Sequence, residues 1–353
     1  MQYHTDDVRI TGMQEVTEPD TLMEEIQITS EASTLVFSTR AAIADIIHRR
    51  DDRLLVVVGP CSIHDPAAAL DYAKRLVSTA EHYRENLLIV MRVYFEKPRT
   101  TVGWKGLIND PHLDNSYDIN EGLRIARRLL LDITKQGITA GTEYLDPITP
   151  QYVGDLVSWG AIGARTTESQ IHRQLASGLS CPVGFKNGTD GTVQIAVDAI
   201  NSSAHSHIFL SVTKRGHSAI FSTSGNQDCH VILRGGSDGP NYDAESVGRT
   251  AGQLSSAGVN AGIMVDMSHA NSQKDHNRQK DVCVDLCGQL AAGNRDLIGV
   301  MIESNLVAGK QSIPENLTDL VYGQSITDAC VDWPDTELML SQLNDAVSAR
   351  RNG

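Results

Sequence analysis

Residues 54–83 read LLVVVGPCSIHDPAAALDYAKRLVSTAEHY, and this stretch contains one complete strand-to-helix unit. Residues 54–59 are almost wholly apolar and β-branched, which is typical of a strand that is buried on both faces. Asp65 and Pro66 then supply an N-cap and a first-turn proline for a helix that continues over residues 67–83. Such a unit predicts a parallel sheet whose strands are joined through helices.

The same alternation of strand and helix continues along the chain. Further strands are predicted at residues 88–95, 138–142, 161–164, 182–185, 231–233, 263–266 and 298–302. Helical segments are predicted near residues 120–135, 151–158, 168–178, 193–202, 243–256 and 279–291. Eight strands in this rhythm favour a TIM (β/α)8 barrel over a doubly wound sheet, which more often uses fewer strands. Functional residues are then expected at the carboxyl ends of the strands.

Two segments lie outside this rhythm. Residues 1–50 form an N-terminal extension to a catalytic barrel that occupies residues 51–353. Two short β-like runs within about residues 207–224 predict an inserted β-hairpin. Oligomer contacts, regulation and plain stabilisation are all reasonable roles for such additions. A homo-oligomer is expected, and the choice between dimer and tetramer is left open.

The composition favours a cytoplasmic enzyme over a nucleic-acid-binding or membrane protein. The chain has 353 residues, a formal net charge of -14 and a pI near 5.2. An acidic chain lacks the broad basic face that nucleic-acid binding needs, and no apolar stretch approaches the ~20 residues of a membrane span. Residues 1–11 lack the features of a secretory signal. The six cysteines include no CxxC pair, which indicates a reducing compartment.

Basic side chains nevertheless lie at the carboxyl ends of several predicted strands. Four of them lie at or near the ends of separate apolar runs: Arg92, Arg165, Lys186 and Arg234. A further cluster follows the second run: Lys97, Pro98, Arg99 and Thr100. Bulk charge does not explain this placement in an acidic chain. Because a barrel brings its strand ends around one mouth, the pattern predicts a pocket for a small polyanion that carries phosphate.

Candidate metal ligands come from the same strand ends and from the last loop. They are Cys61, His269, Glu303 and Asp328. Mixed sulfur, nitrogen and oxygen donors suit Mn, Fe, Co or Zn better than Mg or Ca. No local motif such as HExxH supports the set, and His269 alone fits a hydrogen-bonded loop histidine. Its position three residues after Asp266, at a strand end, favours a ligand.

Five long motifs carry a family resemblance. GPCSIH at residues 59–64, RVYFEKPRT at 92–100, and residues 160–170, 182–191 and 266–271 closely resemble the class I 3-deoxy-D-arabino-heptulosonate 7-phosphate (DAHP) synthases. The resemblance extends over nearly the whole chain. It implies a transferase that condenses phosphoenolpyruvate with D-erythrose 4-phosphate and water to give DAHP and phosphate. This is the first step of the shikimate pathway to chorismate and the aromatic amino acids.

The resemblance also implies a role for each strand-end residue. The phosphoenolpyruvate site would comprise Arg92, Lys97, Arg165, Lys186 and Arg234. The erythrose 4-phosphate site would comprise Lys97, Pro98, Arg99, Thr100 and Asp328. One divalent ion per subunit would be bound by Cys61, His269, Glu303 and Asp328 and would polarise the aldehyde oxygen. Lys97 would lie between the two substrates, and Glu143 would orient the attacking water.

Members of this family are typically feedback-inhibited by an aromatic amino acid. The effector site is expected outside the barrel mouth, at Pro147, Pro150, Gln151, Ser180 and Phe209, with Asp6 and Asp7 from a neighbouring subunit. Asp6 and Asp7 resemble the phenylalanine-sensitive type. Tyr144 and Pro147 depart from that type, and Pro147 resembles the tyrosine-sensitive one. The expected effector is phenylalanine, with tyrosine as the alternative.

Two other functions and one redox hypothesis follow from the same residues. One alternative is another aldol-type synthase on the same barrel that joins phosphoenolpyruvate to arabinose 5-phosphate. The cluster at residues 97–100 and the long extension oppose it. A non-catalytic metabolite sensor is opposed by four metal ligands beside an anion pocket. Cys330 lies two residues beyond Asp328, and we hypothesise that it forms a disulfide with Cys61 when no metal is bound.

Overall fold

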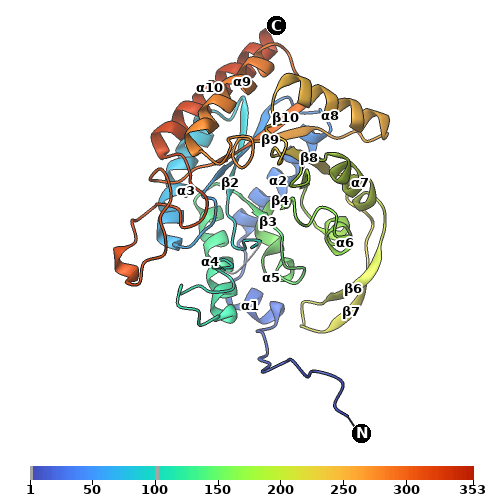
Figure 1. Ribbon diagram of the computed structural model, residues 1–353, viewed down its shortest axis with the longest axis vertical. Coiled ribbons are helices and arrows are strands. Elements are labelled where there is room, and N and C mark those ends of the chain that lie inside the picture. The colour runs from blue at the N-terminus through green and yellow to red at the C-terminus, as the bar shows by residue number, and fades with distance from the viewer. Residues whose placement is uncertain (1–2, 100–102) are drawn as a thin grey trace.

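The computed structural model describes residues 3–99 and 103–353, and its centre is a closed barrel of eight parallel strands (Figure 1). The strands are β1 (Leu54–Gly59), β2 (Leu87–Arg92), β3 (Ala140–Glu143), β4 (Val157–Ile162), β5 (Val183–Lys186), β8 (Cys229–Leu233), β9 (Ile263–Asp266) and β10 (Leu297–Glu303). Their order around the barrel is β1-β10-β9-β8-β5-β4-β3-β2. All of their residues except Leu88 are buried, as the apolar runs predicted. The predicted TIM barrel is therefore confirmed.

Helices surround the barrel and connect its strands. They are α1 (Pro19–Glu25), α2 (Ser30–Ile47), α3 (Pro66–His82), α4 (Ile119–Lys135), α5 (Pro150–Val153), α6 (Gln170–Gly178), α7 (Gln194–Ser203), α8 (Ala244–Ser256), α9 (Gln279–Ala291) and α10 (Trp333–Asn352). The side chains of Asp65, Ser169 and Asp243 accept backbone N–H groups at the starts of α3, α6 and α8. These N-caps limit how far each strand-end loop extends. Within the described residues, no helix combines the length and apolar character of a bilayer span.

The helix predicted at residues 151–158 is wrong beyond its first turn. A short 3-10 turn replaces it at Gly154–Leu156, and β4 begins at Val157 instead of at residue 161. The guanidinium of Arg40, from α2, donates to the carbonyl oxygens of Gly154 at 2.6 Å and Val157 at 2.7 Å. A continuing helix would use these carbonyl groups for its own hydrogen bonds, so the contact with Arg40 ends it.

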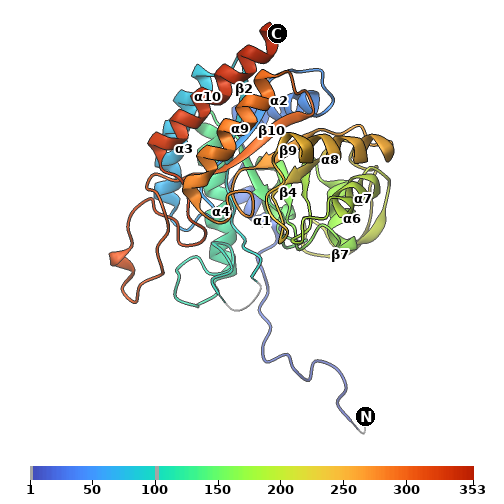
Figure 2. The same cartoon turned by 45° about the horizontal axis from the view of Figure 1, so that its top comes forward.

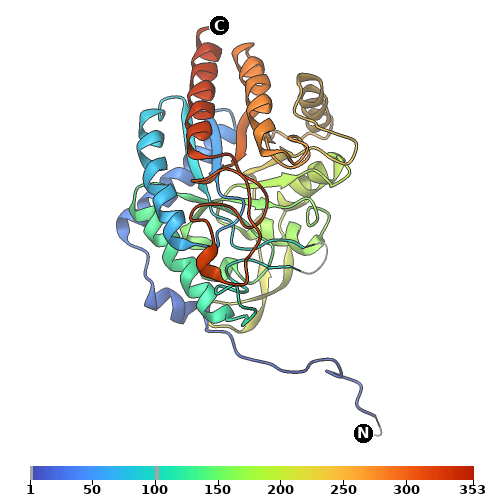
Figure 3. The ribbon, with the colours of Figure 1, turned by 60° about the vertical axis from the view of Figure 1, so that its left-hand side comes forward.

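The N-terminal extension contributes to the barrel core. Ile43, Ile46 and Ile47 of α2 are buried and form one cluster with Leu55 and Val57 of β1. Helix α2 therefore packs against the barrel core itself. Residues 3–14 instead extend away from the body as an arm (Figures 2 and 3).

The predicted hairpin is confirmed as β6 (Ile208–Val212) paired antiparallel with β7 (Ser218–Ser222). Phe209 and Phe221 face each other across the pair, with ring centroids 6.2 Å apart. The alternate residues point the other way, and Ile208, Leu210 and Ile220 are 72%, 80% and 72% exposed. The ribbon thus has apolar side chains on both of its faces.

A polar pair is buried in the barrel interior. Trp159 Nε1 donates to His230 Nε2 at 2.9 Å, and both side chains are fully buried. His230 Nδ1 lies 3.1 Å from the carbonyl oxygen of Val231. A neutral imidazole with its proton on Nδ1 satisfies both contacts. Burial lowers the pKa of His230 from 6.5 to about 4.

We predict that His230 makes the fold acid-sensitive. The unfolded chain binds a proton near pH 6.5, whereas the folded chain binds it only near pH 4, so stability is lost as the pH falls through this window. Relative to His230→Gln, the wild type should lose about 2 kcal/mol of unfolding free energy between pH 7 and pH 5. Urea unfolding of both proteins at both pH values measures this. A stability difference that does not change with pH would contradict the prediction.

Candidate active site

The carboxyl ends of the barrel strands surround a cavity of about 510 Å³. It is lined by ten of the predicted site residues: Lys97, Pro98, Arg99, Glu143, Arg165, Lys186, Arg234, His269, Glu303 and Asp328. Cys61 and Arg92 are fully buried and contact these residues from beneath. Thr100 lies outside the described residues. Residues that are far apart in the sequence thus converge at one mouth, as the barrel prediction required.

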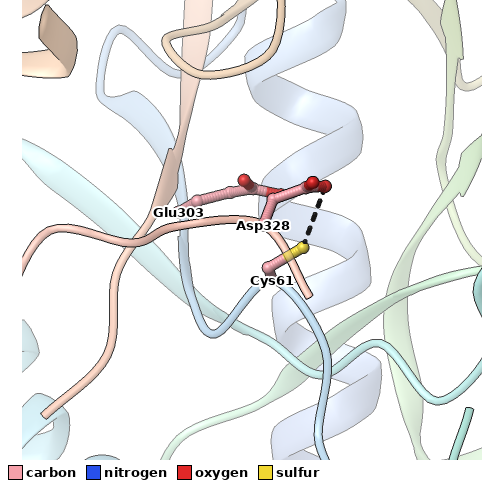
Figure 4. A group of neighbouring side chains, drawn as sticks. All are labelled: Cys61, Glu303 and Asp328. Carbon is pink, nitrogen blue, oxygen red and sulfur yellow. Dashed lines mark hydrogen bonds between the residues drawn. The ribbon is translucent and has the colours of Figure 1, made fainter. Parts of the chain in front are cut away.

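Three of the four candidate metal ligands form a tight group (Figure 4). Cys61 Sγ and one oxygen each from Glu303 and Asp328 all lie within 4.8 Å of one another. His269 is outside this group, but its Nε2 lies 3.9 Å from Glu303 Oε1. The donors are one sulfur, one imidazole nitrogen and two carboxylates, which fits a borderline divalent ion.

Asp266 orients both halves of the site, a role that the strand-end pattern did not predict. Its buried Oδ2 lies 2.8 Å from His269 Nδ1 and accepts a hydrogen bond from Lys186 Nζ at 3.0 Å. Burial opposes ionisation, but His269 and Lys186 outweigh it and hold the pKa of Asp266 well below its ordinary value. With its proton on Nδ1, His269 keeps a free lone pair on Nε2, the nitrogen that faces Glu303. The sequence feature that could have indicated this role is an aspartate that ends an apolar run three residues before a histidine.

Arg92 lies beneath the cavity and supports the metal-binding group. Its Nη2 donates to Glu303 Oε1 at 2.9 Å and to the Cys61 carbonyl oxygen at 3.1 Å. Its guanidinium also stacks on Tyr94, 3.6 Å from the ring centroid. Through these contacts the Arg92 side chain holds Glu303 and the backbone at Cys61 in place. Arg92 is therefore not among the residues that line the cavity.

Lys97, one of the basic residues that line the cavity, contacts the metal-binding group through Cys61. Lys97 Nζ lies 3.1 Å from Cys61 Sγ and 3.9 Å from Asp328 Oδ2. Burial disfavours the ammonium form, but Cys61 and Glu303 outweigh it and raise the pKa of Lys97. Burial, and then Glu303, raise the pKa of the Cys61 thiol to about 11. Cys61 must lose this proton to become a metal ligand.

The disulfide proposed between Cys61 and Cys330 stays a hypothesis. Both residues are buried free thiols in this structure. Cys330 Sγ lies 3.6 Å from the carbonyl oxygen of Asp328, so it approaches the site from the last loop.

The other side of the cavity carries the positive charge. Lys186 is buried, Arg234 is half-buried and Arg165 is exposed. Burial lowers the pKa of Arg234; Asp266 opposes this effect, and the positive charge of Arg165, which lines the same cavity, adds to it. Seven lysines and arginines line the cavity against three acidic residues, which makes the mouth cationic in an acidic chain.

Two of these cations, Lys274 and Lys310, were not predicted from the sequence. They belong to the loops after β9 and β10 and lie several residues beyond the strand ends that the apolar runs mark. Glu143 is buried beside Gly163, and a Cβ at that glycine would lie 2.3 Å from Glu143 Oε1. Glycine at position 163 therefore keeps the carboxylate in the cavity.

A second cavity, of about 920 Å³, lies between the hairpin and the barrel. Four of the predicted effector residues line it: Pro150, Gln151, Ser180 and Phe209. Tyr144 is also part of the lining, but Pro147 is not. Asp6 and Asp7 are exposed on the extended arm (Figure 1). The structure of one chain therefore brings together four of the seven predicted residues.

Known proteins resemble this chain over nearly its whole length. The model of the DAHP synthetase I family matches residues 25–341. The Phe-sensitive phospho-2-dehydro-3-deoxyheptonate aldolase of Escherichia coli (strain K12) is 60% identical, covering 99% of this chain and 100% of that protein. The phospho-2-dehydro-3-deoxyheptonate aldolase of Haemophilus influenzae is 58% identical, covering 98% and 95%. The solved structure of this aldolase from Francisella tularensis has a TM-score of 0.95 and 54% identity, covering 97% and 100%.

We predict that Cys61→Ala weakens the binding of Co²⁺ by more than ~100-fold, because it removes the only sulfur in the donor group. The absorption band of thiolate-bound cobalt should disappear with it. Titration of the metal-stripped protein with Co²⁺ under reducing conditions measures both effects. Cys330→Ala is the matched control, since Cys330 is equally buried but outside the donor group. Wild-type cobalt affinity in Cys61→Ala would refute the role of Cys61.

Proposed function

The chain belongs to the DAHP synthetase I family, and from this membership we propose that it is a 3-deoxy-7-phosphoheptulonate synthase. It condenses phosphoenolpyruvate with D-erythrose 4-phosphate and water, giving DAHP and inorganic phosphate at the start of the shikimate pathway. The observation that carries this proposal is the single cavity that combines a cationic wall with a thiol, imidazole and carboxylate group. A simple phosphate-binding protein needs the first feature but not the second.

The cationic wall binds phosphoenolpyruvate. Arg165 and Arg234 offer planar guanidinium groups that match carboxylate and phosphate oxygens in pairs, and Lys186 adds a point charge. Asp266 holds the Lys186 ammonium in place through its 3.0 Å hydrogen bond. Fixed cations replace the water around the anion, so little reorganisation is needed when the reaction occurs.

The loop after β2 receives the second substrate. Arg99 binds the phosphate of erythrose 4-phosphate, and Pro98 restricts the backbone next to it. The Lys97 ammonium lies at the boundary between this loop and the metal-binding group, so it hydrogen-bonds to groups of both substrates. This arrangement keeps the aldehyde carbon next to the enol carbon. The reaction of two bound anions then no longer requires them to meet in solution.

The reaction forms one carbon–carbon bond and exchanges one carbon–oxygen bond at C2, where an oxygen from water replaces the bridging oxygen of the phosphate. The C3 carbon of phosphoenolpyruvate attacks the aldehyde carbon, water adds to C2, and phosphate leaves with its bridging oxygen. A divalent ion bound by Cys61, His269, Glu303 and Asp328 supplies Lewis-acid polarisation of the aldehyde oxygen, and Mn, Fe, Co and Zn all suit this donor set. Glu143 orients the water that adds to C2.

The second cavity is the site of feedback inhibition, and its ligand is phenylalanine. Phe209, Phe221 and Leu179 provide an apolar wall for the ring, while Gln151 and Ser180 offer polar groups for the amino acid head. The Escherichia coli relative is named as Phe-sensitive, which supports the same effector here. Tyrosine is the alternative effector, because Pro147 resembles the tyrosine-sensitive type and Tyr144, which is part of the lining, departs from the phenylalanine-sensitive one.

A second copy of the chain completes this regulatory site. An isolated two-stranded ribbon is marginally stable, and the outer face of the hairpin carries three exposed apolar side chains. The arm also exposes Val8, Ile10 and Met13. In a homodimer or tetramer these surfaces cover one another, and the arm brings Asp6 and Asp7 to the neighbour's cavity. The six free cysteines fit a reducing, cytoplasmic location for the assembly.

The activity itself is tested with both substrates and Mn²⁺. We expect one phosphate released and one DAHP formed for each phosphoenolpyruvate consumed, at a rate at least ~100-fold higher with erythrose 4-phosphate than with arabinose 5-phosphate. Arg165→Ala should raise the KM for phosphoenolpyruvate by ~100-fold, because it removes a charge-assisted contact. Faster turnover of arabinose 5-phosphate would identify a different synthase. Binding without phosphate release would identify a sensor.

Inhibition by phenylalanine tests the regulatory site. Phe209→Ala and Asp7→Ala should each raise the half-inhibitory concentration of phenylalanine by at least ~10-fold and leave the uninhibited rate unchanged, because both residues are outside the barrel mouth. Asp281→Ala, an exposed aspartate on α9, is the matched control. Wild-type inhibition of Asp7→Ala would exclude a contribution from the arm. Stronger inhibition by tyrosine would overturn the effector assignment.

A further inference from the structure

Three asparagine side chains join the ends of three neighbouring strands. Asn187 follows Lys186 at the end of β5, Asn241 lies in the loop after β8, and Asn271 lies in the loop after β9. These strands are consecutive in the barrel. Asn187 and Asn271 are almost fully buried, and Asn241 is half-buried.

Asn187 and Asn241 hold the backbone that follows β8. Asn187 Oδ1 accepts from the Arg234 N–H at 2.8 Å, and its Nδ2 donates to the Gly235 carbonyl oxygen at 3.0 Å. Asn241 Oδ1 accepts from the Gly235 N–H at 2.7 Å, and its Nδ2 lies 3.3 Å from Asn187 Oδ1. The backbone around Arg234 is thus hydrogen-bonded by side chains after the strand ladder has ended.

Asn271 extends the same network to the loop after β9. Its Oδ1 accepts from the Asn241 N–H at 2.8 Å. Its Nδ2 donates to the carbonyl oxygens of Asp266 at 2.8 Å and Leu233 at 3.2 Å. The network therefore connects, through backbone groups, the segments that carry Lys186, Arg234 and His269.

Electrostatic repulsion between the cations of the cavity opposes the asparagine network. Lys186, Arg234 and Arg165 are like charges around one cavity, and their repulsion favours spreading of the loops that carry them. The asparagine contacts are neutral, so they resist spreading without cancelling the charge that attracts the anion. Gly235 permits this close packing, since a Cβ there would lie 2.8 Å from Ala270 and from the Asn271 nitrogen.

We propose that Asn187, Asn241 and Asn271 are positioning residues that hold the loops after β5, β8 and β9 together, so that the phosphoenolpyruvate-binding cations are in place before the substrate arrives. This inference rests on the proposed function of the cavity. Among the described residues of the loop after β2, which binds erythrose 4-phosphate in that function, none contributes a hydrogen bond to this network. Its effect is therefore selective for one of the two substrates.

Asn241→Ala tests the proposal with the smallest risk to folding, because Asn241 is the half-buried member. We expect its KM for phosphoenolpyruvate to rise ~10-fold, with the KM for erythrose 4-phosphate within about twofold of wild type. The inhibition constant of inorganic phosphate, competing with phosphoenolpyruvate, should rise by a similar factor. Asn241→Ser keeps an oxygen that can accept from Gly235 and should fall between the wild type and Asn241→Ala.

The matched control is Asn294→Ala. Asn294 is also half-buried and accepts two backbone N–H groups, from Asp296 and Leu297, but it lies at the amino end of β10. Both substrate constants should stay at wild-type values in this variant. Equal changes of both KM values in Asn241→Ala, or no change in either, would overturn the positioning role.

Calorimetric binding of phosphoenolpyruvate alone separates this inference from the proposed function. A wild type that binds phosphoenolpyruvate but turns over no aldose phosphate would refute the function, and the loss of binding in Asn241→Ala would still support the network. A wild type that turns over both substrates, with unchanged binding in Asn241→Ala and Asn241→Ser, would refute the network alone.

Discussion

Charge pairing in the barrel mouth is the interaction on which the site depends. The buried cations Arg92, Lys97 and Lys186 are each stable there because a carboxylate lies nearby: Glu303 at 2.9 Å, Asp328 at 3.9 Å and Asp266 at 3.0 Å. The same carboxylates form or orient the metal-binding group. The same acidic groups therefore pair the buried cations and hold the metal ligands in place. Removal of any one of them would leave a cation without its partner and would displace a ligand.

This pairing also explains how an acidic protein attracts anions. The net charge of -14 belongs to the whole surface, whereas the cavity lining is cationic. The buried cations Lys97 and Lys186 each have a carboxylate partner on one side and face the cavity on the other. Part of their electric field is therefore directed into the cavity, where low-dielectric walls strengthen it. Local arrangement, and not the overall charge, thus decides what the mouth binds.

The barrel could be predicted because parallel strands that are buried on both faces appear in the sequence as continuous apolar runs. Most of the cavity lining could be predicted because the polar residues that end these runs lie at the same end of the barrel. Asp266 and the three asparagines were missed as positioning residues because their roles depend on contacts between loops, which leave no periodic pattern. The position of Arg92 beneath the cavity depends on its packing against Tyr94 and Met301, which leaves no sequence pattern, and its role in binding phosphoenolpyruvate stays a prediction. The early start of β4 was missed because Arg40, more than a hundred residues away, ends the preceding helix.

Pairing of β1 with β10 has a consequence for synthesis. Leu55 lies opposite Gly299 in the barrel, so the first strand meets its second neighbour only after residues 297–303 have left the ribosome. Until then the apolar faces of α2 and β1 lack their final partners. The nascent chain therefore passes through a long stage with exposed apolar surface, and its yield in the cell depends on chaperone capacity as well as on final stability.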